Sequence, residues 1–266
     1  MKIAHLLLLT SLFTTAACAS SDAAVPESEG DDAGDVSGAS DSDITSGTSA
    51  KLTKVTYKKT VAVPGSTTEK CAYDISWVRV SNLSTSVRAA LNSALYYGPK
   101  KADIACEDPG GEVEGGYSKV SVNSSGVLSV EYGHYQMSNG AAHPNTYVTQ
   151  INLSLATGKW IKLSDILTAE GKKTLLDSCT KQWKAHAAAE GEPDMAQDGA
   201  PCEGALTLGS NQTEAFTIEK GGLRVHIDNQ LPHVIVSLAG DGFFVSWREL
   251  GTGVKGGSVV KGLANR

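Results

Sequence analysis

The chain has 266 residues, of which 41% are apolar and 20% charged, and its formal net charge is −6. This composition is that of a globular protein, so a wholly disordered or collagen-like chain is excluded. The only apolar run that suggests a membrane lies at the extreme N-terminus, which excludes a protein with several membrane spans. The negative charge argues mildly against a nucleic-acid-binding protein.

Residues 1–17 have the pattern of an export signal. Lys2 supplies a positive start, residues 6–13 form a short apolar stretch, and small residues lead to Cys18. This combination is typical of a secretory signal peptide. Thr15-Ala16-Ala17-Cys18 resembles the bacterial lipobox, in which the cysteine is acylated and becomes the new N-terminus. We therefore predict a lipoprotein signal peptide over 1–17; cleavage that leaves Cys18 without lipid is the alternative.

Residues 18–50 are expected to be the lipid anchor and an acidic, disordered tether. From residue 19 onward the segment carries acidic side chains without any lysine or arginine, and the remainder is mostly Ser, Gly, Ala and Thr. Such a segment cannot bury enough apolar surface to offset its ordering entropy. The whole-chain acidity belongs to this tether, so the body from residue 51 onward is nearly neutral. We expect the body outside the cytoplasm; Ala19, which is not aspartate, favours the outer membrane if the host has two membranes.

Four cysteines remain if Cys18 carries lipid. An even number of cysteines in an exported protein indicates disulfides. The pairs Cys71–Cys106 and Cys179–Cys202 each bracket one local segment, so we favour these two bonds over the two other pairings. The sequence has no CxxC or HxxxH spacing, and we expect neither a metal site nor a cofactor.

Hydrophobic periodicity predicts the elements of the body in chain order. Strands are expected over 52–63 and 72–80, a helix up to about residue 97, a loop over 107–116, a hairpin of 117–122 and 127–137, a strand over 147–155, helices from 164 and over 170–189, a loop over 190–214, and closing strands over 216–218, 223–227, 234–238 and 243–247. Strands dominate and the helices form two clusters. This pattern predicts an α+β fold with helices packed on an antiparallel sheet.

The search for catalytic motifs finds none: GxSxG, the P-loop and the dinucleotide-binding glycine pattern are absent from the sequence. Polar side chains are densest in the connection between two predicted strands, where Tyr135, His143, Asn145 and Tyr147 are candidate ligand-binding residues. The alternative is that His143 and Asn145 bond the loop's own backbone. His226 lies in an alternating run, and we expect it on the solvent face.

Three segments carry a resemblance to a known family. They are Asn139 to Tyr147 with the sequence NGAAHPNTY, Ile151 to Lys159 with INLSLATGK, and Leu163 to Leu167 with LSDIL. Together they resemble the signature of the RsiV-like C-terminal domain, which occurs in a bacterial anti-sigma factor and beside the catalytic domain of a peptidoglycan deacetylase. The closing strands resemble the end of the same domain.

The resemblance implies an α+β fold in two small subdomains. Residues 51–124 would form an N-terminal α+β subdomain, 125–250 the RsiV-like domain, and 251–266 a flexible tail. In the anti-sigma factor this domain binds lysozyme and is not itself a known catalyst. We therefore expect a non-catalytic envelope module that binds a protein such as lysozyme or the peptidoglycan of the cell wall, and no nucleic acid.

Two alternatives from other classes remain open. The first is a glycan-modifying or hydrolytic enzyme, in which His143 acts as a base beside a carboxylate such as Asp165 or Glu131. The second is a structural envelope lipoprotein with no specific ligand. The sequence alone does not bring a base and a carboxylate together, so the spatial arrangement has to decide between these functions.

Overall fold

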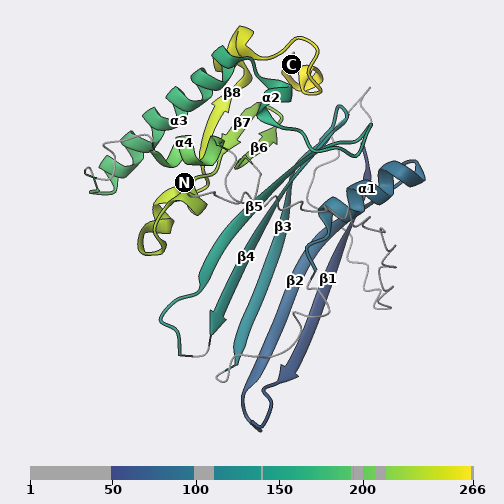
Figure 1. Ribbon diagram of the computed structural model, residues 1–266, viewed down its shortest axis with the longest axis vertical. Coiled ribbons are helices and arrows are strands. Elements are labelled where there is room, and N and C mark those ends of the chain that lie inside the picture. The colour runs from purple at the N-terminus through teal and green to yellow at the C-terminus, as the bar shows by residue number, and fades with distance from the viewer. Residues whose placement is uncertain are drawn as a thin grey trace, which may run out of the picture. The chain divides into compact units, whose positions relative to one another are not determined.

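The computed structural model describes residues 49–98, 111–138, 140–192, 194, 200–207 and 214–264. Cys18, Cys106, the predicted signal peptide and nearly all of the predicted tether lie outside these residues. The strands and helices (Figure 1) are β1 (Lys51–Ala62), β2 (Lys70–Ser81), α1 (Thr85–Leu95), β3 (Glu112–Ser124), β4 (Val127–Ser138), β5 (Asn145–Ser154), α2 (Leu163–Ile166), α3 (Ala169–Ala189), α4 (Ala200–Leu206), β6 (Phe216–Glu219), β7 (Gly222–Val225), η3 (Asp228–Gln230), η4 (His233–Ala239), β8 (Phe243–Ser246), α5 (Trp247–Leu250), η5 (Gly251–Gly253) and α6 (Lys261–Ala264).

The larger sheet has the order β1-β2-β3-β4-β5. Its neighbours are antiparallel except for β2 and β3, which run parallel. The parallel pair arises because α1 and the segment after it lie between these strands, which gives the chain the length it needs to cross over. A tight turn joins β3 to β4, with positive φ at Ser125 and Gly126, as two-residue hairpins require.

One face of this sheet, here called the α1 face, carries the first hydrophobic core. Leu91 and Leu95 of α1 are fully buried against Leu128 and Val130 of β4. Figure 1 shows α1 beside β1 and β2. The side chains of β4 alternate, so its even-numbered residues point to α1 and its odd-numbered residues point to the opposite side, here called the cleft face.

The second core belongs to the three-stranded sheet, whose order is β6-β7-β8. Helix α3 packs beside β8 (Figure 1), and its Trp183 is fully buried against Phe243. Cys179 of α3 is bonded to Cys202 of α4, which confirms that predicted disulfide. Closing this loop adds about 3 kcal/mol in the chain-entropy model. The other predicted bond, Cys71–Cys106, involves a residue outside the described ones.

The two sheets are joined by side chains that take the place of a strand. Asn152 Nδ2 donates to the carbonyl of Phe216 (2.7 Å), and Ile218 N donates both to Ser129 Oγ (3.0 Å) and to Asn152 Oδ1 (3.2 Å). The edge of β6 is therefore satisfied by two polar side chains of β4 and β5. Because a buried backbone group without a partner is costly, this bridge fixes the second sheet on the cleft face.

The α+β class predicted from the sequence is confirmed, but several local expectations differ. The predicted strand over 234–238 is the 3-10 helix η4, which begins after Pro232 and ends at Gly240 with positive φ. An apolar run of this length fits a helix or a strand equally well. The predicted loop over 190–214 contains α4, and part of the loop over 107–116 is the start of β3.

The expected boundary between the two subdomains falls inside the larger sheet. The boundary between residues 124 and 125 falls in the turn between β3 and β4, two neighbours in one sheet. In the expected tail, residues 251–266, Val260 and Leu263 are buried in the second core. The body thus consists of two layers, each with its own apolar core.

Candidate functional site

A cleft of about 310 Å³ opens between the cleft face of the larger sheet and the segment that follows β7. Its lining comes from β3 and β4 (Tyr117, Lys119, Glu131), from β5 (Thr146, Tyr147, Val148), and from the C-terminal layer (His226, Asp228, Val236, Ser237, Ala239, Gly240, Asp241). Acidic, basic and imidazole groups thus meet where the two layers join. Titratable groups in a concave site are the usual starting point for a functional hypothesis.

Glu131 lies in the middle of β4 and is only 7% exposed. Its Oε2 lies 3.6 Å from His226 Nε2, and the Tyr117 hydroxyl donates a hydrogen bond to the carboxylate. Burial raises the pKa of Glu131, and nearby Lys119 acts in the opposite direction. A partly desolvated carboxyl group therefore stands at the floor of the cleft.

The predicted position of His226 on the solvent face is wrong. The residue is only 5% exposed and is buried between the layers. Burial, together with the positive charge of Arg224, lowers the pKa of His226 to about 4. The ring lies 3.1 Å from the hydroxyl of Thr217, itself buried. His226 is thus neutral at pH 7, and its contact with Glu131 is not a pair of opposite charges.

Asp228 and its neighbour Asn229 hold the free edge of β5. The Asp228 carboxylate accepts from Val148 N (3.2 Å), and Asn229 Nδ2 donates to the Val148 carbonyl (2.9 Å). Burial raises the pKa of Asp228. Like the Asn152 bridge, these side chains substitute for a strand, so Asp228 is engaged in holding the cleft wall.

The structure does not bring the four predicted ligand-binding residues together. Tyr135 points to the cleft face, because it pairs with Gly115 two cross-strand rungs beyond Glu131. Tyr147 and, by alternation, Asn145 point to the α1 face. His143 lies exposed in the turn between β4 and β5.

On the α1 face, Tyr147 belongs to an aromatic cluster. Its ring lies 4.4 Å from that of His134, whose Nε2 is 2.8 Å from Glu114 Oε1. Burial raises the pKa of Tyr147, and the neighbouring phenol of Tyr97 raises it further. These contacts attach the end of β5 to the segment after α1, so the Tyr147 ring packs on the α1 face although the residue also lines the cleft.

The predicted carboxylate partners of His143 lie elsewhere. Gln136, the last residue of β4 paired with β5, lies five residues beyond Glu131, which corresponds to about 17 Å along the strand. Asp165 accepts a hydrogen bond from Lys162 N at the start of α2. Strand β4 thus carries Glu131 well away from the turn that holds His143, and the imidazole beside Glu131 is that of His226.

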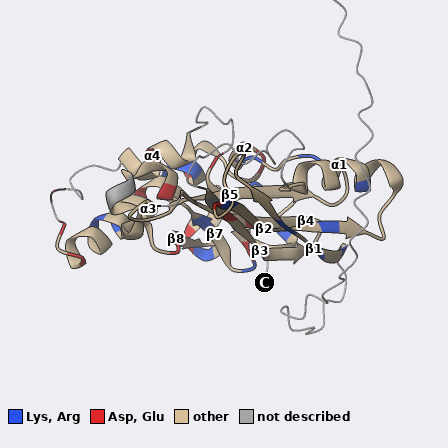
Figure 2. Cartoon of the chain, turned by 90° about the horizontal axis from the view of Figure 1, so that it is seen from below, with Lys and Arg blue, Asp and Glu red and all other residues tan. Residues whose placement is uncertain are grey.

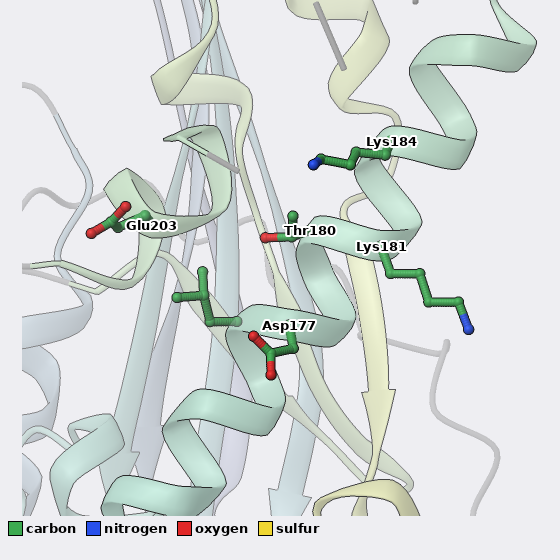
Figure 3. A pocket seen from close by; sticks show the side chains of 6 residues that line it. Asp177, Thr180, Lys181, Lys184 and Glu203 are labelled. Carbon is green, nitrogen blue, oxygen red and sulfur yellow. The ribbon is translucent and has the colours of Figure 1, made fainter. Parts of the chain in front are cut away.

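A second hollow, of about 470 Å³, lies between α3 and α4 (Figure 3). Lys184 and Thr180 project toward the Glu203 side of this hollow, and Lys181 projects away from it. Asp177 forms an ion pair with Lys173 on the outside of α3. The charged residues that line this hollow stand on the surfaces of the helices, whereas the cleft contains titratable groups that burial removes from water. The cleft is therefore the better candidate.

Acidic and basic residues are interspersed along the described part of the chain (Figure 2). Within the same residues, three or more potential metal ligands nowhere gather into a group able to hold an ion. None of the helices in the described part of the chain is long and apolar enough to cross a bilayer.

Comparison with solved structures identifies the class of fold. The chain is similar to a member of the DUF3298 family from Bacteroides fragilis, with a TM-score of 0.58 and 16% identity, covering 83% of this chain and 100% of that one. A DUF3298 family protein from Pseudomonas aeruginosa is similar with a TM-score of 0.51 and 16% identity, over 77% of this chain and 95% of the other. The resemblance to the RsiV-like domain family is confirmed at the level of the fold. No family model matches the sequence, and no curated protein is significantly similar to it.

Sequence reasoning did not bring the central group of the cleft together: it named Glu131 only as a partner for His143 and placed His226 on the solvent face. Glu131 lies more than 90 positions before His226 and Asp228 in the chain, and the three residues form no motif. One signal was available: Ser129 and Glu131 alternate with apolar residues along β4, which places polar groups on one face of a strand flanked by hairpins. The partners on the C-terminal layer had no comparable signal.

Proposed function

We propose that this protein is an exported lipoprotein, acylated at Cys18, whose folded body is a non-catalytic binding module of the cell envelope. The lipobox-like segment and the acidic tether support the anchor. The fold shared with the DUF3298 structures supports the module. Its ligand is the glycan of the cell wall or a protein such as lysozyme.

The observation that carries this proposal is the state of the polar groups around the cleft. Asp228 is bonded to the edge of β5, His226 is neutral and lies beside Thr217, and Tyr117 is bonded to Glu131. These bonds hold a preformed cleft open between two layers. Each of these polar groups already has a partner within the protein. A general base needs freedom to reach a substrate proton, so the arrangement favours recognition over proton transfer.

Binding is tested with the full chain in detergent micelles. We expect retention on purified peptidoglycan or on immobilised lysozyme that is competed by the same ligand in solution. The control is the variant Trp160→Ala, which changes an exposed aromatic residue away from the cleft. Absence of saturable binding to both ligands would overturn the binding module.

The lipid anchor is tested separately with Cys18→Ser. The native protein should partition into the detergent phase, because two or three acyl chains hold a protein firmly on a membrane. The variant should move to the aqueous phase with unchanged binding. Equal partitioning of the two proteins would refute the anchor at Cys18.

One observation favours a second function. Burial raises the pKa of Glu131, which is the property a general acid of glycoside cleavage requires. In this alternative Glu131, and not His143, protonates the leaving oxygen. Release of reducing sugars from peptidoglycan that disappears in Glu131→Gln and persists in Glu190→Gln would establish the enzyme in place of the binding module.

A further inference from the structure

Two tyrosines of the cleft face lie flat across the neighbouring strand. Tyr117 of β3 pairs with Gly133 of β4, and Tyr135 of β4 pairs with Gly115 of β3. In both pairs the outer part of the tyrosine ring covers the glycine, and a methyl group on the glycine would collide with that ring. The glycines are thus the positions that let both rings rest on the backbone of the facing strand.

This arrangement makes the two rings a preformed surface. One side of each ring contacts backbone and the other is open to solvent: Tyr117 is 52% exposed and Tyr135 is 39% exposed. The pairs are consecutive on this face, so they are about 7 Å apart along the strands. Because each ring already rests on the sheet, binding a ligand against it costs little side-chain entropy.

The surface continues in both directions along the strands. On one side comes the pair Val113 and Met137, which are 45% and 37% exposed. On the other comes the pair Lys119 and Glu131, which lines the cleft. Exposed apolar residues that run into a polar hollow are typical of a binding groove.

We propose that this strip, named here the tyrosine platform and made of Tyr117 and Tyr135, binds a saccharide chain whose end enters the cleft. The proposal rests on the proposed function and assigns its ligand and site. The flat C–H face of a pyranose ring matches the negative face of a tyrosine ring. Its hydroxyl groups need donors and acceptors on the same side, which Lys119 and Glu131 supply at the next pair.

The shape of the platform favours a saccharide over a protein. A protein interface gains affinity from side chains that insert into pockets on the partner. Here the position opposite each tyrosine is a glycine filled by the ring itself, so the surface is flat at both pairs. A flat aromatic surface leading to a small hollow fits a chain of stacked rings.

The test uses the full chain in detergent, with purified peptidoglycan and a soluble N-acetylglucosamine tetramer as probes. Tyr117→Leu and Tyr135→Leu keep an apolar cover over Gly133 and Gly115 but remove the flat ring. Each should weaken saccharide binding about tenfold, and together about a hundredfold. Tyr→Phe at both positions should keep binding within about threefold, because the ring remains.

Controls separate this inference from the proposed function. Trp160→Ala should bind as the native protein does, and thermal unfolding of every variant verifies its fold. Saccharide affinity unchanged in the double leucine variant would overturn the platform. Native protein that binds lysozyme but neither saccharide would also overturn it while leaving the binding module intact. Binding to none of the three would overturn both.

Discussion

The two faces of the five-stranded sheet are covered in different ways. On the α1 face, apolar residues such as Leu91 and Leu95 pack against Leu128 and Val130, and contact is mostly between hydrocarbon groups. On the cleft face, one end is bonded to the second sheet through Ser129 and Asn152, and the other end exposes tyrosines.

This difference shows where the fold leaves room for function. Burying apolar area is non-directional and tolerates small shifts, so the α1 face supplies stability. Hydrogen bonds between layers are directional, so the bridge of Ser129 and Asn152 fixes the distance and register of the second layer. The cleft lies where this polar cover ends, and its width depends on that bridge. Changes on the cleft face should therefore affect both stability and binding.

The largest expected effect follows from breaking the bridge with Asn152→Ala. The carbonyl of Phe216 loses its partner, and Ile218 N keeps only Ser129. Unpartnered buried groups cost about 1–3 kcal/mol each, and we expect a loss of about 4 kcal/mol in the free energy of unfolding with the cavity included. Urea unfolding measures it. Asn229→Ala, which removes one bond at an exposed residue, should cost less than about 1 kcal/mol, and equal losses would contradict the role of the bridge.

The second prediction concerns acid. The pKa of His226 is lowered to about 4 in the fold, from an ordinary value of 6.5. Between these values the unfolded chain binds the extra proton, so His226 makes stability fall as the pH falls from 6.5 to 4. The loss is about 3 kcal/mol. Glu131 and Asp228 act in the opposite direction, since burial raises the pKa of each.

The variant His226→Gln isolates this contribution. Glutamine keeps a donor near Thr217 but does not titrate. Its unfolding free energy relative to the native protein should rise by about 3 kcal/mol between pH 7 and pH 4. A constant difference between His226→Gln and the native protein across this range would exclude a buried neutral imidazole.

Much of the fold could be predicted because its signals are local. Alternation gave β1, β2, β4 and β5, and helical spacing gave α3. The prediction of a strand over 234–238 failed because a short apolar run has no decisive periodicity. Helix α4 was not predicted because Pro201 and Gly204 are poor helix formers and because its packing depends on the disulfide to α3.

The candidate site could be predicted only in part, because its geometry depends on strand register. Tyr135 was found from the density of polar and aromatic residues around it. Its pairing with Gly115, and that of Tyr117 with Gly133, requires knowing that β3 and β4 meet in this register. His226 was misplaced because alternation assigns a residue to a face, and both faces of β7's end are covered here.

A smaller effect is expected on the α1 face from Tyr132→Phe. The Tyr132 hydroxyl donates to the Leu95 carbonyl (2.9 Å) and accepts from Val78 N (3.3 Å). Its ring stacks on Tyr97 and stays in the variant. Loss of these two bonds should lower the free energy of unfolding by about 1–2 kcal/mol, measured by urea unfolding, with no change in ligand binding. Weakened binding at equal stability would link the α1 face to the site.

The smallest expected effect has the opposite sign and comes from Glu131→Gln. Because burial raises the pKa of Glu131 in the fold, ionising this group costs more in the folded than in the unfolded protein. Its contribution is most favourable below the unfolded pKa and is lost as the pH rises through the folded one. A neutral glutamine avoids this cost, so the variant should be more stable than the native protein at pH 7, by less than about 1 kcal/mol. The gain should vanish toward pH 4, where Glu131 is protonated in both states. Thermal unfolding at both pH values measures it, with the exposed Glu190→Gln as control; a variant that is less stable at pH 7 would show that the carboxylate's bond from Tyr117 outweighs its desolvation.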